Sequence, residues 1–266
     1  MENVRKKRGL ICFLFMLAMM LALPIGASAA TKITMNRSIK YAKKGYTIFV
    51  YNKMKGKNIK VYKRTNPRKG SYCTIEYGAA MVVNTSKLRT GKKYTMLPVY
   101  LNNRTRNGKM VTGYVKVSQV GIKRVNMKKA STNKTIRKAI YYGFRHLGTP
   151  FLLGAGDIDN QIDCANFVKA IYEYAGKSMP YPHTDYLQQV CYEIPKSRLK
   201  PGDLVFYLKN DTSGPIDHVG VYIGSGLMIN SSGHYGDTYP QGGITVKRIN
   251  YGNRKPVRCM RIRGLS

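Results

Sequence analysis

The feature that most constrains the fold is an alternation of short β-forming runs with turn sequences in the first half of the chain. The runs are rich in β-branched and aromatic residues, and turn signals such as Asn66-Pro67-Arg68-Lys69-Gly70 separate them. Several strands of this length so close together predict a small β-barrel or sandwich. The runs are Tyr46–Tyr51, Ile59–Tyr62, Cys73–Tyr77, Ala80–Val83, Tyr94–Tyr100 and Thr112–Val117.

The second half follows another pattern, with two helices before a series of strands. Apolar residues recur at helical spacing from about residue 134, after Thr132 or Asn133 as a cap and before Gly148-Thr149-Pro150. A second helix is predicted from Cys164 to about Ala175, with Cys164 on its inward face. Five strand-like runs follow between residues 203 and 263. This order predicts an α+β fold in which helices pack on an antiparallel sheet.

The first 30 residues have the three-part pattern of a secretory signal peptide. Four basic residues (5–8) precede an uncharged apolar run, Leu10–Leu23, and the small residues Ala27-Ser28-Ala29. The apolar run is shorter than the ~20 residues that cross a bilayer. We therefore expect a secreted or wall-associated protein with no membrane span after cleavage. The predicted organisation is a signal peptide (1–30), a small basic β domain (31–120), a linker (121–133) and an α+β domain (134–266).

Basic residues are concentrated in the first half of the chain that follows this leader. Residues 31–130 hold 25 Lys and Arg but one acid, Glu76, whereas residues 131–266 hold 17 Lys and Arg and 10 acids. A field this large attracts polyanions. Nucleic acid is the usual partner of such a patch, but an exported protein meets anionic wall polymers instead. We expect those polymers and no nucleic acid, with a merely soluble basic surface as the alternative.

Cys164 and His218 form a candidate catalytic pair. Unpaired N–H groups and the dipole at a helix start stabilise a thiolate and lower its pKa. His218 opens a predicted strand, and packing of the helix start on that strand would bring the imidazole to the sulfur. Such a pair suits nucleophilic acyl transfer, with the Cys164 N–H helping to hold the oxyanion. Asp163 either caps the helix or binds a substrate amine.

Hairpin geometry suggests which residue orients His218. If Gly224-Ser225-Gly226 is a three-residue loop, Gly220 faces Asn230. His218 and Asn230 then share one face of the sheet as diagonal neighbours, while Asp217 points to the other face. A two-residue turn would reverse this parity and turn Asn230 away.

Four segments carry a family resemblance: Leu147–Phe151, Ile162–Val168, Leu199–Phe206 and Asp217–Asn230. In this order they resemble the NlpC-type family of papain-like wall endopeptidases, over about residues 133–264. The resemblance implies that Cys164 attacks, that His218 activates it and protonates the leaving amine, and that a polar third residue orients His218. It also implies cleavage between D-glutamate and the diamino acid of peptidoglycan stem peptides, with no cofactor.

Three positions depart from the usual pattern of that family. Phe151 stands where tyrosine is usual, Ala165-Asn166 replaces Ser-Gly after the cysteine, and Asn230 replaces the commoner histidine. Because of the departures at Phe151 and Ala165-Asn166, the sequence does not determine the reaction rate or the substrate. A non-catalytic or weakly active wall-binding protein on the same scaffold is therefore the alternative, and an amidase or transpeptidase is a third reading. Phe151, Asp163 and the loop residue His183 are the candidate substrate-binding residues.

The remaining signals are weaker. Residues 40–120 resemble a bacterial Src-homology-3-like wall-binding domain in the order of their strands. The spacing of Cys, His and Asp suggests no metal site, and the lack of a GxSxG motif leaves a serine hydrolase unsupported. We expect His146 to end a helix and His234 to lie in a surface loop. If Cys164 is a free nucleophile, three cysteines remain beyond the leader, so a full disulfide framework is not expected, although a Cys191–Cys259 pair stays open.

Overall fold

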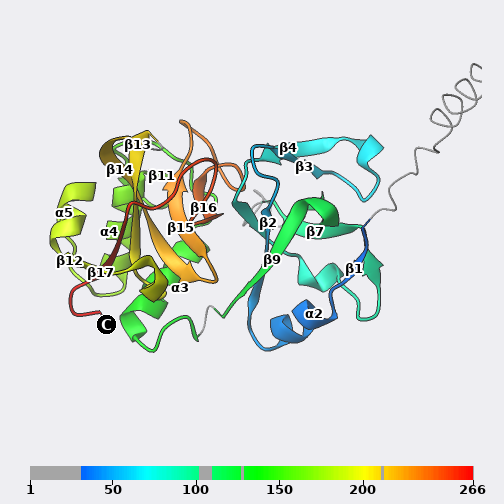
Figure 1. The fold of residues 1–266 in the computed structure, drawn as a ribbon, viewed down its shortest axis with the longest axis horizontal. Helices are drawn as coiled ribbons and strands as arrows, with labels where there is room; N and C mark the ends of the chain where they lie inside the picture. Colours follow the sequence, from blue (N-terminus) through cyan, green and yellow to red (C-terminus); the bar gives the residue numbers. More distant parts are fainter. Residues whose placement is uncertain (1–30, 102–109, 127–128, 211–212, 266) are drawn as a thin grey trace, which may run out of the picture. The chain divides into compact units, whose positions relative to one another are not determined.

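The structure is a computed structural model that describes residues 31–101, 110–126, 129–210 and 213–265 (Figure 1). The signal peptide expected at residues 1–30 lies outside the described residues. Residues 32–266 form one compact unit. In the parts of the chain that are described, no helix is long and apolar enough to cross a membrane.

A nine-stranded antiparallel sheet runs through both halves of the sequence (Figure 1). The two halves meet where β16 pairs with β5, through Val246 opposite Ala80 and Lys247 opposite Ala79. The α+β class predicted from the sequence is confirmed. In spatial order the strands are β12 (Cys191–Glu193), β17 (Arg258–Ile262), β13 (Leu204–Asn210), β14 (Ser213–Gly224), β15 (Leu227–Ser232), β16 (Gly243–Arg248), β5 (Ala79–Val82), β2 (Thr47–Asn52) and β9 (Val120–Val125).

Two helices pack against each other and against the central strands of this sheet. They are α3 (Lys134–Arg145) and α4 (Cys164–Tyr174), and α4 contacts β14 and β15. Asn133 caps α3 by accepting a hydrogen bond from the Ile136 N–H at 3.2 Å. The apolar stripe of α4 is buried, and each large side chain removed from water in this way contributes roughly 1.5–3 kcal/mol. Two shorter helices are α2 (Asn36–Lys43) and α5 (Thr184–Gln189).

A second sheet, of four antiparallel strands, lies in the first half of the chain. Its order is β4 (Ser71–Ile75), β3 (Ile59–Tyr62), β8 (Thr112–Lys116) and β7 (Met96–Tyr100). One face of this sheet is buried and apolar, and the other carries Lys and Tyr side chains. The remaining strands form two short pairs, β1 (Ile33–Thr34) with β6 (Lys93–Tyr94) and β10 (Gly156–Asp157) with β11 (Gln161–Ile162). The predicted strands are thus present, whereas the barrel-like domain and its boundaries remain predictions.

Besides unpredicted short strands such as β12, the fold differs from the sequence prediction at three larger elements. Residues 121–125 were expected in a linker but form most of β9 and pair with β2. The basic residues Lys123 and Arg124 made this segment resemble a linker in the sequence. Helix α2 was not predicted, since it has only eight residues and only Ser38 within it is fully buried. Helix α5 was missed because it has only six residues.

Candidate active site

Cys164 is the first residue of α4, and Asp163 fixes this helix start. One Asp163 carboxylate oxygen accepts from the Asn166 N–H at 2.8 Å and the other accepts from the Gly154 N–H at 2.9 Å. The capping role considered for Asp163 is therefore present. Asn166, in a position where the family usually has glycine, also donates its side-chain amide to Asp163 at 3.1 Å.

The β14–β15 hairpin reaches the expected register by an unexpected route. Tyr222 pairs with Met228, as a three-residue loop predicts, but Gly224 pairs with Leu227 after a register shift. The turn itself therefore has two residues, and Ser225 has a positive φ of 57°. A two-residue turn alone would reverse the parity of the strands. The bulge next to it adds one residue and restores the parity.

His218 and Asn230 consequently meet inside the protein. The His218 Nε2 lies 3.0 Å from Asn230 Oδ1, with the two residues 6% and 0% exposed. The Asn230 side-chain N–H₂ donates to the Thr245 carbonyl at 3.2 Å, which fixes the orientation of the amide. Because an amide oxygen only accepts hydrogen bonds, Nε2 must carry the proton. Nδ1 of His218 is thereby left with its lone pair.

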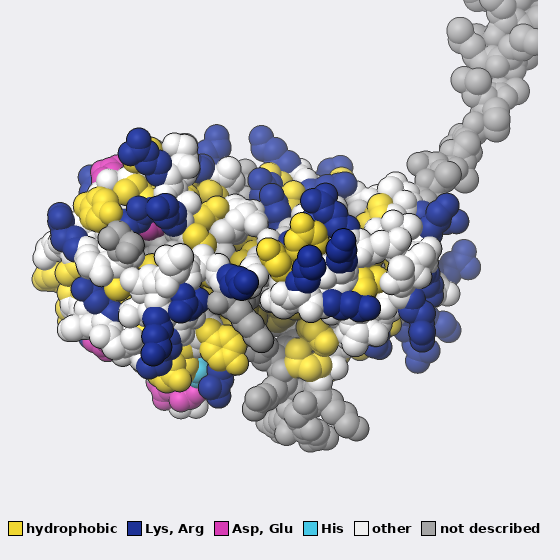
Figure 2. Space-filling view, turned by 90° about the horizontal axis from the view of Figure 1, so that it is seen from below, with side chains coloured by type: hydrophobic (Ala, Val, Ile, Leu, Met, Phe, Trp, Pro, Cys, Tyr) yellow, Lys and Arg dark blue, Asp and Glu magenta, His cyan; other side chains and the backbone are white. Residues whose placement is uncertain are grey.

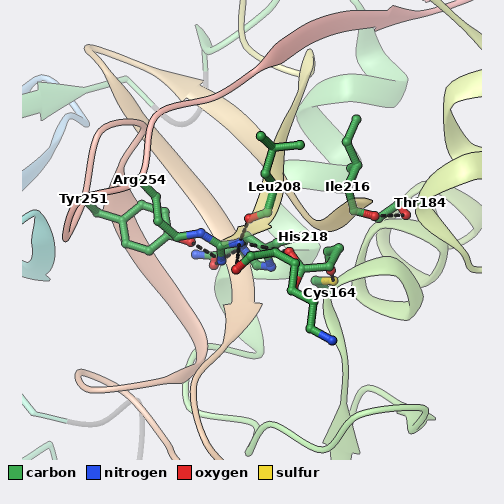
Figure 3. Close-up of polar contacts among 10 residues, drawn as sticks. Cys164, Thr184, Leu208, Ile216, His218, Tyr251 and Arg254 are labelled. Atoms are coloured by element: carbon green, nitrogen blue, oxygen red, sulfur yellow. Dashed lines mark hydrogen bonds and ion pairs between the residues drawn. The ribbon is translucent and has the colours of Figure 1, made fainter. Parts of the chain in front are cut away.

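The Cys164 sulfur packs against the backbone on both sides of His218. It lies 3.8 Å from the Asp217 carbonyl oxygen, and the Val219 N–H also points to it. Figure 3 shows Cys164 on one side of His218, with Tyr251 and Arg254 approaching from the other. The helix start and the strand thus bring together the two residues that the sequence predicted as a pair.

Burial controls the protonation of this pair. It raises the pKa of Cys164 to about 12, with the Asp163 carboxylate adding to the increase and the Val219 N–H opposing it. Burial also lowers the pKa of His218 to about 3, followed in importance by the charges of Arg254 and Lys247. Both groups are therefore neutral near pH 7. The expectation that the helix start lowers the pKa of Cys164 is wrong for this state, because Cys164 is only 7% exposed.

Arg254 crosses over the site from the segment between β16 and β17. Its guanidinium donates to Asp217 Oδ1 at 2.9 Å, to the Leu208 carbonyl, and to the Tyr251 hydroxyl at 3.4 Å (Figure 3). The Asp217 carboxylate is thus engaged by Arg254 rather than by the imidazole. No sequence pattern pointed to Arg254, which lies 37 residues from Asp217 and outside the four segments that carry the family resemblance.

Two tyrosine rings flank the imidazole. The ring of Tyr207 lies 5.7 Å from that of His218, and the ring of Tyr251 lies 6.5 Å away. Tyr207 stands directly opposite His218 on β13. Tyr207 lies in the first of the five strand-like runs predicted between residues 203 and 263, but the pairing register was needed to place it at the site.

A cavity of about 340 Å³ lies beside the site. It joins the two halves of the chain, because Glu76 on one wall forms an ion pair with Lys247 on the other at 2.6 Å. Tyr251 lines the cavity and its ring lies 6.5 Å from that of His218, so the cavity is next to the site, although Cys164 and His218 are not among its lining residues. Its lining residues are Asn58, Thr74, Glu76, Ser232, Gly233, His234, Asp237, Gln241, Lys247, Tyr251 and Arg254.

None of the three predicted substrate-binding residues, Phe151, Asp163 and His183, lines this cavity. The Phe151 N–H donates to the Asp237 carbonyl at 3.0 Å, so Phe151 supports the cavity wall through its backbone. His183 caps α5, and its side chain is 56% exposed and lies 3.5 Å from Asp185. His234, expected to be only a surface residue, is exposed and does line the cavity. His146 ends α3 as expected, with Nδ1 2.9 Å from the Tyr142 carbonyl oxygen.

The other cysteines among the described residues are also thiols. Cys73, Cys191 and Cys259 are unpaired, so the Cys191–Cys259 disulfide left open by the sequence is not formed. Burial raises the pKa of each. Among the described residues, no group of three or more His, Cys, Asp or Glu side chains is placed to hold a metal ion.

A cysteine at a helix start, a histidine on the adjacent strand and an asparagine bound to that histidine form the arrangement of papain-like cysteine peptidases. Residues 148–249 match the sequence model of the NlpC/P60 family, and the chain carries a domain of this family. The matched segment contains Cys164, His218 and Asn230.

Individual relatives match parts of the chain. A probable endopeptidase p60 of Listeria innocua is 37% identical over 87 residues, covering 33% of this chain and 18% of that protein. A gamma-D-glutamyl-L-lysine dipeptidyl-peptidase of Bacillus subtilis is 31% identical over 128 residues, covering 45% and 41%. The chain thus spans less than half the length of these relatives. The solved structure of an NlpC/P60 family protein from Bacillus cereus aligns with 85% of this chain and 66% of its own, at 19% identity and a TM-score of 0.41.

Proposed function

We propose that this protein is a peptidoglycan endopeptidase that cleaves wall stem peptides with Cys164 as the nucleophile. The observation that carries this proposal is the bond of 3.0 Å between His218 and Asn230, formed beside the sulfur at the start of α4. It leaves Nδ1 of His218 unprotonated and the imidazole held in one orientation. These are the two properties required of the general base in a cysteine peptidase.

The first half-reaction follows from the neutral pair. As the Cys164 sulfur attacks the scissile carbonyl carbon, its proton passes to His218 Nδ1. The carbonyl oxygen becomes an oxyanion, which the Cys164 N–H stabilises, since N–H groups in the first turn of a helix have no partner within it. When the carbon–nitrogen bond breaks, Nδ1 returns the proton to the leaving amine, and a thioester remains on Cys164.

The second half-reaction releases the acyl group. Water attacks the thioester carbon and gives a proton to His218 Nδ1. The carbon–sulfur bond then breaks, the product leaves as a carboxylic acid, and the sulfur takes the proton back. Asn230 keeps the imidazole oriented through both steps, and Tyr207 and Tyr251 limit the access of water to it.

The bond we propose joins D-glutamate to the diamino acid of the stem. The name of the Bacillus subtilis relative, a gamma-D-glutamyl-L-lysine dipeptidyl-peptidase, supports this choice. The cavity beside His218 is the place proposed for stem residues next to the scissile bond, with contacts from His234 and Arg254. Phe151 acts indirectly, by holding Asp237 in the cavity wall.

The cell wall is the proposed location and partner. The signal-peptide pattern at residues 1–30 supports export, and the excess of Lys and Arg in residues 31–130 supports binding to anionic wall polymers. Such electrostatic binding weakens as salt concentration rises.

A weakly active or non-catalytic wall-binding protein is the second candidate function. One observation favours it: Cys164 is buried and has a pKa of about 12, so the resting site holds almost no thiolate. The two candidates differ in what happens when a stem peptide enters, because a peptidase needs His218 to take the proton only during attack.

The test is to incubate the mature protein and Cys164→Ala with purified stem peptides and to identify the products by mass spectrometry. Cleavage at the D-glutamyl bond by the parent alone supports the proposal, and denaturation curves confirm that the variant is folded. Cleavage at another bond would retain the thiol chemistry and reject the proposed specificity. If neither folded protein cleaves any of several stem types, the binding function replaces the enzymatic one.

A further inference from the structure

The outer face of the four-stranded sheet carries an ordered set of basic and aromatic side chains. On β3 and β8 the alternation buries Val61 and Val115 and turns Tyr62 and Tyr114 outward, where these two residues stand opposite each other. Tyr114 in turn stands opposite Pro98 on β7. The outward face is therefore continuous across three strands.

Lysine ammonium groups lie over tyrosine rings at three places around this sheet. Lys116 lies 5.7 Å from the ring centre of Tyr62, Lys63 lies 5.8 Å from that of Tyr72, and Lys92 lies 5.6 Å from that of Tyr94. Cation–π contacts of this length hold flexible lysine side chains at defined positions. The three ammonium groups are therefore held at defined positions by rings of which Tyr72 is exposed and Tyr94 is buried.

A pocket of about 390 Å³ ends this face beside β7. None of its lining residues is acidic, and among the described residues Lys87, Lys92 and Lys93 form no ion pair. Glu76, the only acid in residues 31–130, is bound to Lys247 elsewhere. The positive charge of the pocket is thus uncompensated. The lining residues are Thr65, Lys87, Lys92, Lys93, Tyr94, Thr95, Met96, Pro98 and Tyr114.

The chemistry of this lining fits a phosphate joined to a sugar or polyol. Three ammonium groups and the hydroxyls of Thr65 and Thr95 suit phosphate oxygens. The flat ring of Tyr114, which is half-buried, suits the carbon skeleton between phosphates. Figure 2 shows Lys and Arg side chains over both halves of the molecule, whereas acidic side chains are seen on the half that does not contain the four-stranded sheet. The broader field would draw a polyanion toward the half that contains this sheet.

We propose that this lysine pocket, Lys87, Lys92 and Lys93 with Tyr94 and Tyr114, binds a phosphodiester unit of an anionic sugar- or polyol-phosphate polymer. The choice of a wall polymer over nucleic acid rests on the function proposed above. The pocket specifies which residues would bind the wall polymer in that function. In this proposal the polymer binds at a site of defined residues and is not held by diffuse electrostatic attraction alone.

The pocket and the catalytic cavity lie at opposite ends of one strand. Asn58 lines the cavity, just before β3 begins, and Thr65 lines the pocket beyond the end of β3. The four residues of β3 between these positions span roughly 13 Å at about 3.3 Å per residue. A polymer held in the pocket therefore leaves the cavity open while keeping the enzyme beside its substrate.

The test measures binding of the mature protein to poly(glycerol phosphate) of defined length as a function of salt. The variant is Lys87→Gln/Lys92→Gln/Lys93→Gln. The matched control is Lys40→Gln/Lys43→Gln/Lys44→Gln, which removes the same charge from exposed positions on and next to α2. We expect the pocket variant to lose at least about 10-fold in affinity and the control about 3-fold or less. The slope of log K against log salt should fall by roughly 0.7–0.9 for each phosphate group that the variant no longer neutralises.

Equal losses in the two variants would overturn the site, since diffuse charge would then explain binding. Single-stranded DNA with the same number of phosphates tests the other polyanion. If DNA binds as tightly as the polymer and shows the same pocket-specific loss, the pocket is a nucleic-acid site and the proposal fails. Cleavage of soluble stem peptides should be unchanged in both variants. A parent that binds the polymer but cleaves no stem peptide would reject only the catalytic function.

Discussion

The catalytic site and the lysine pocket beside the four-stranded sheet differ in the burial and pairing of their polar side chains. At the site, His218 and Asn230 are buried and hydrogen-bonded to each other, and Arg254 is bound to Asp217. In the pocket beside the outer face, Lys87, Lys92 and Lys93 are exposed, and within the described residues no carboxylate binds them.

This difference reflects two kinds of recognition. A buried group needs a partner inside the protein, because removing it from water unpaired costs more than a hydrogen bond returns. The site is therefore rigid, and its Cys164 and His218 are neutral at rest. The exposed lysines remain hydrated and can exchange water and counterions for phosphate oxygens. Changes at the two regions should accordingly differ in both size and salt dependence.

The largest effect is expected from His218→Ala, which removes the base while leaving the thiol in place. Loss of general acid–base catalysis should lower kcat/KM for stem-peptide cleavage by about 10²–10⁴-fold. The control is His146→Gln, at a histidine that ends α3 and touches Tyr142 and Asp159. Steady-state kinetics on both variants make the measurement. Equal activity losses in the two variants would show that structural damage, and not the loss of proton transfer by His218, lowers the activity.

A smaller effect is expected in the stability of the parent at low pH. Folding lowers the pKa of His218 from 6.5 to about 3, so in this interval the unfolded chain binds a proton that the folded chain does not. The contribution of neutral His218 is present above pH 6.5 and is lost as pH falls toward 3. Between pH 7 and pH 4 it should lower the free energy of unfolding by up to about 3 kcal/mol.

Denaturant unfolding of the parent and of His218→Gln at both pH values isolates this contribution. The parent should lose more stability than the variant over the interval. If the two lose the same amount, His218 titrates normally in the folded protein, and the neutral resting pair is wrong.

The smallest effect is expected for Glu76→Gln, which removes the ion pair between the two halves of the chain. The Lys247 side chain is 5% exposed and Glu76 38%, so the change leaves a buried ammonium without its carboxylate. Removing one partner of a buried ion pair costs about 3–5 kcal/mol, and exposure of Glu76 reduces this to roughly 1–2 kcal/mol.

The matched control is Glu173→Gln, whose partner Lys169 lies one turn away on the surface of α4. Exposed pairs of this kind contribute about 0.3–0.5 kcal/mol. Urea unfolding measures both variants. Equal costs would mean that the ion pair between Glu76 and Lys247 adds nothing to the junction of the two halves.

Local sequence patterns predicted much of this arrangement. The cap at Asn133, the helix start at Cys164 and the shared face of His218 and Asn230 all depend on spacing over a few residues. Even there, the hairpin reached its register through a bulge that no local pattern required.

Interactions between distant segments escaped prediction. Arg254 reaches Leu208 across 46 residues, and Glu76 reaches Lys247 across 171. No local sequence pattern around either residue predicts its contact partner. Strand β9 was missed for a related reason, because its pairing with β2 decides its structure while its basic residues suggest a linker.

The pairing of β16 with β5 also bears on how this protein can be divided. The segment that matches the family, residues 148–249, ends just after β16. If the chain is cut before residue 134, β16 loses β5 and becomes an open edge, with backbone N–H and C=O groups free to pair with other molecules. The isolated segment would also leave Lys247 without Glu76. The smallest unit that closes this edge therefore includes β5, so the boundary drawn by sequence similarity is not the boundary at which the protein can be safely truncated.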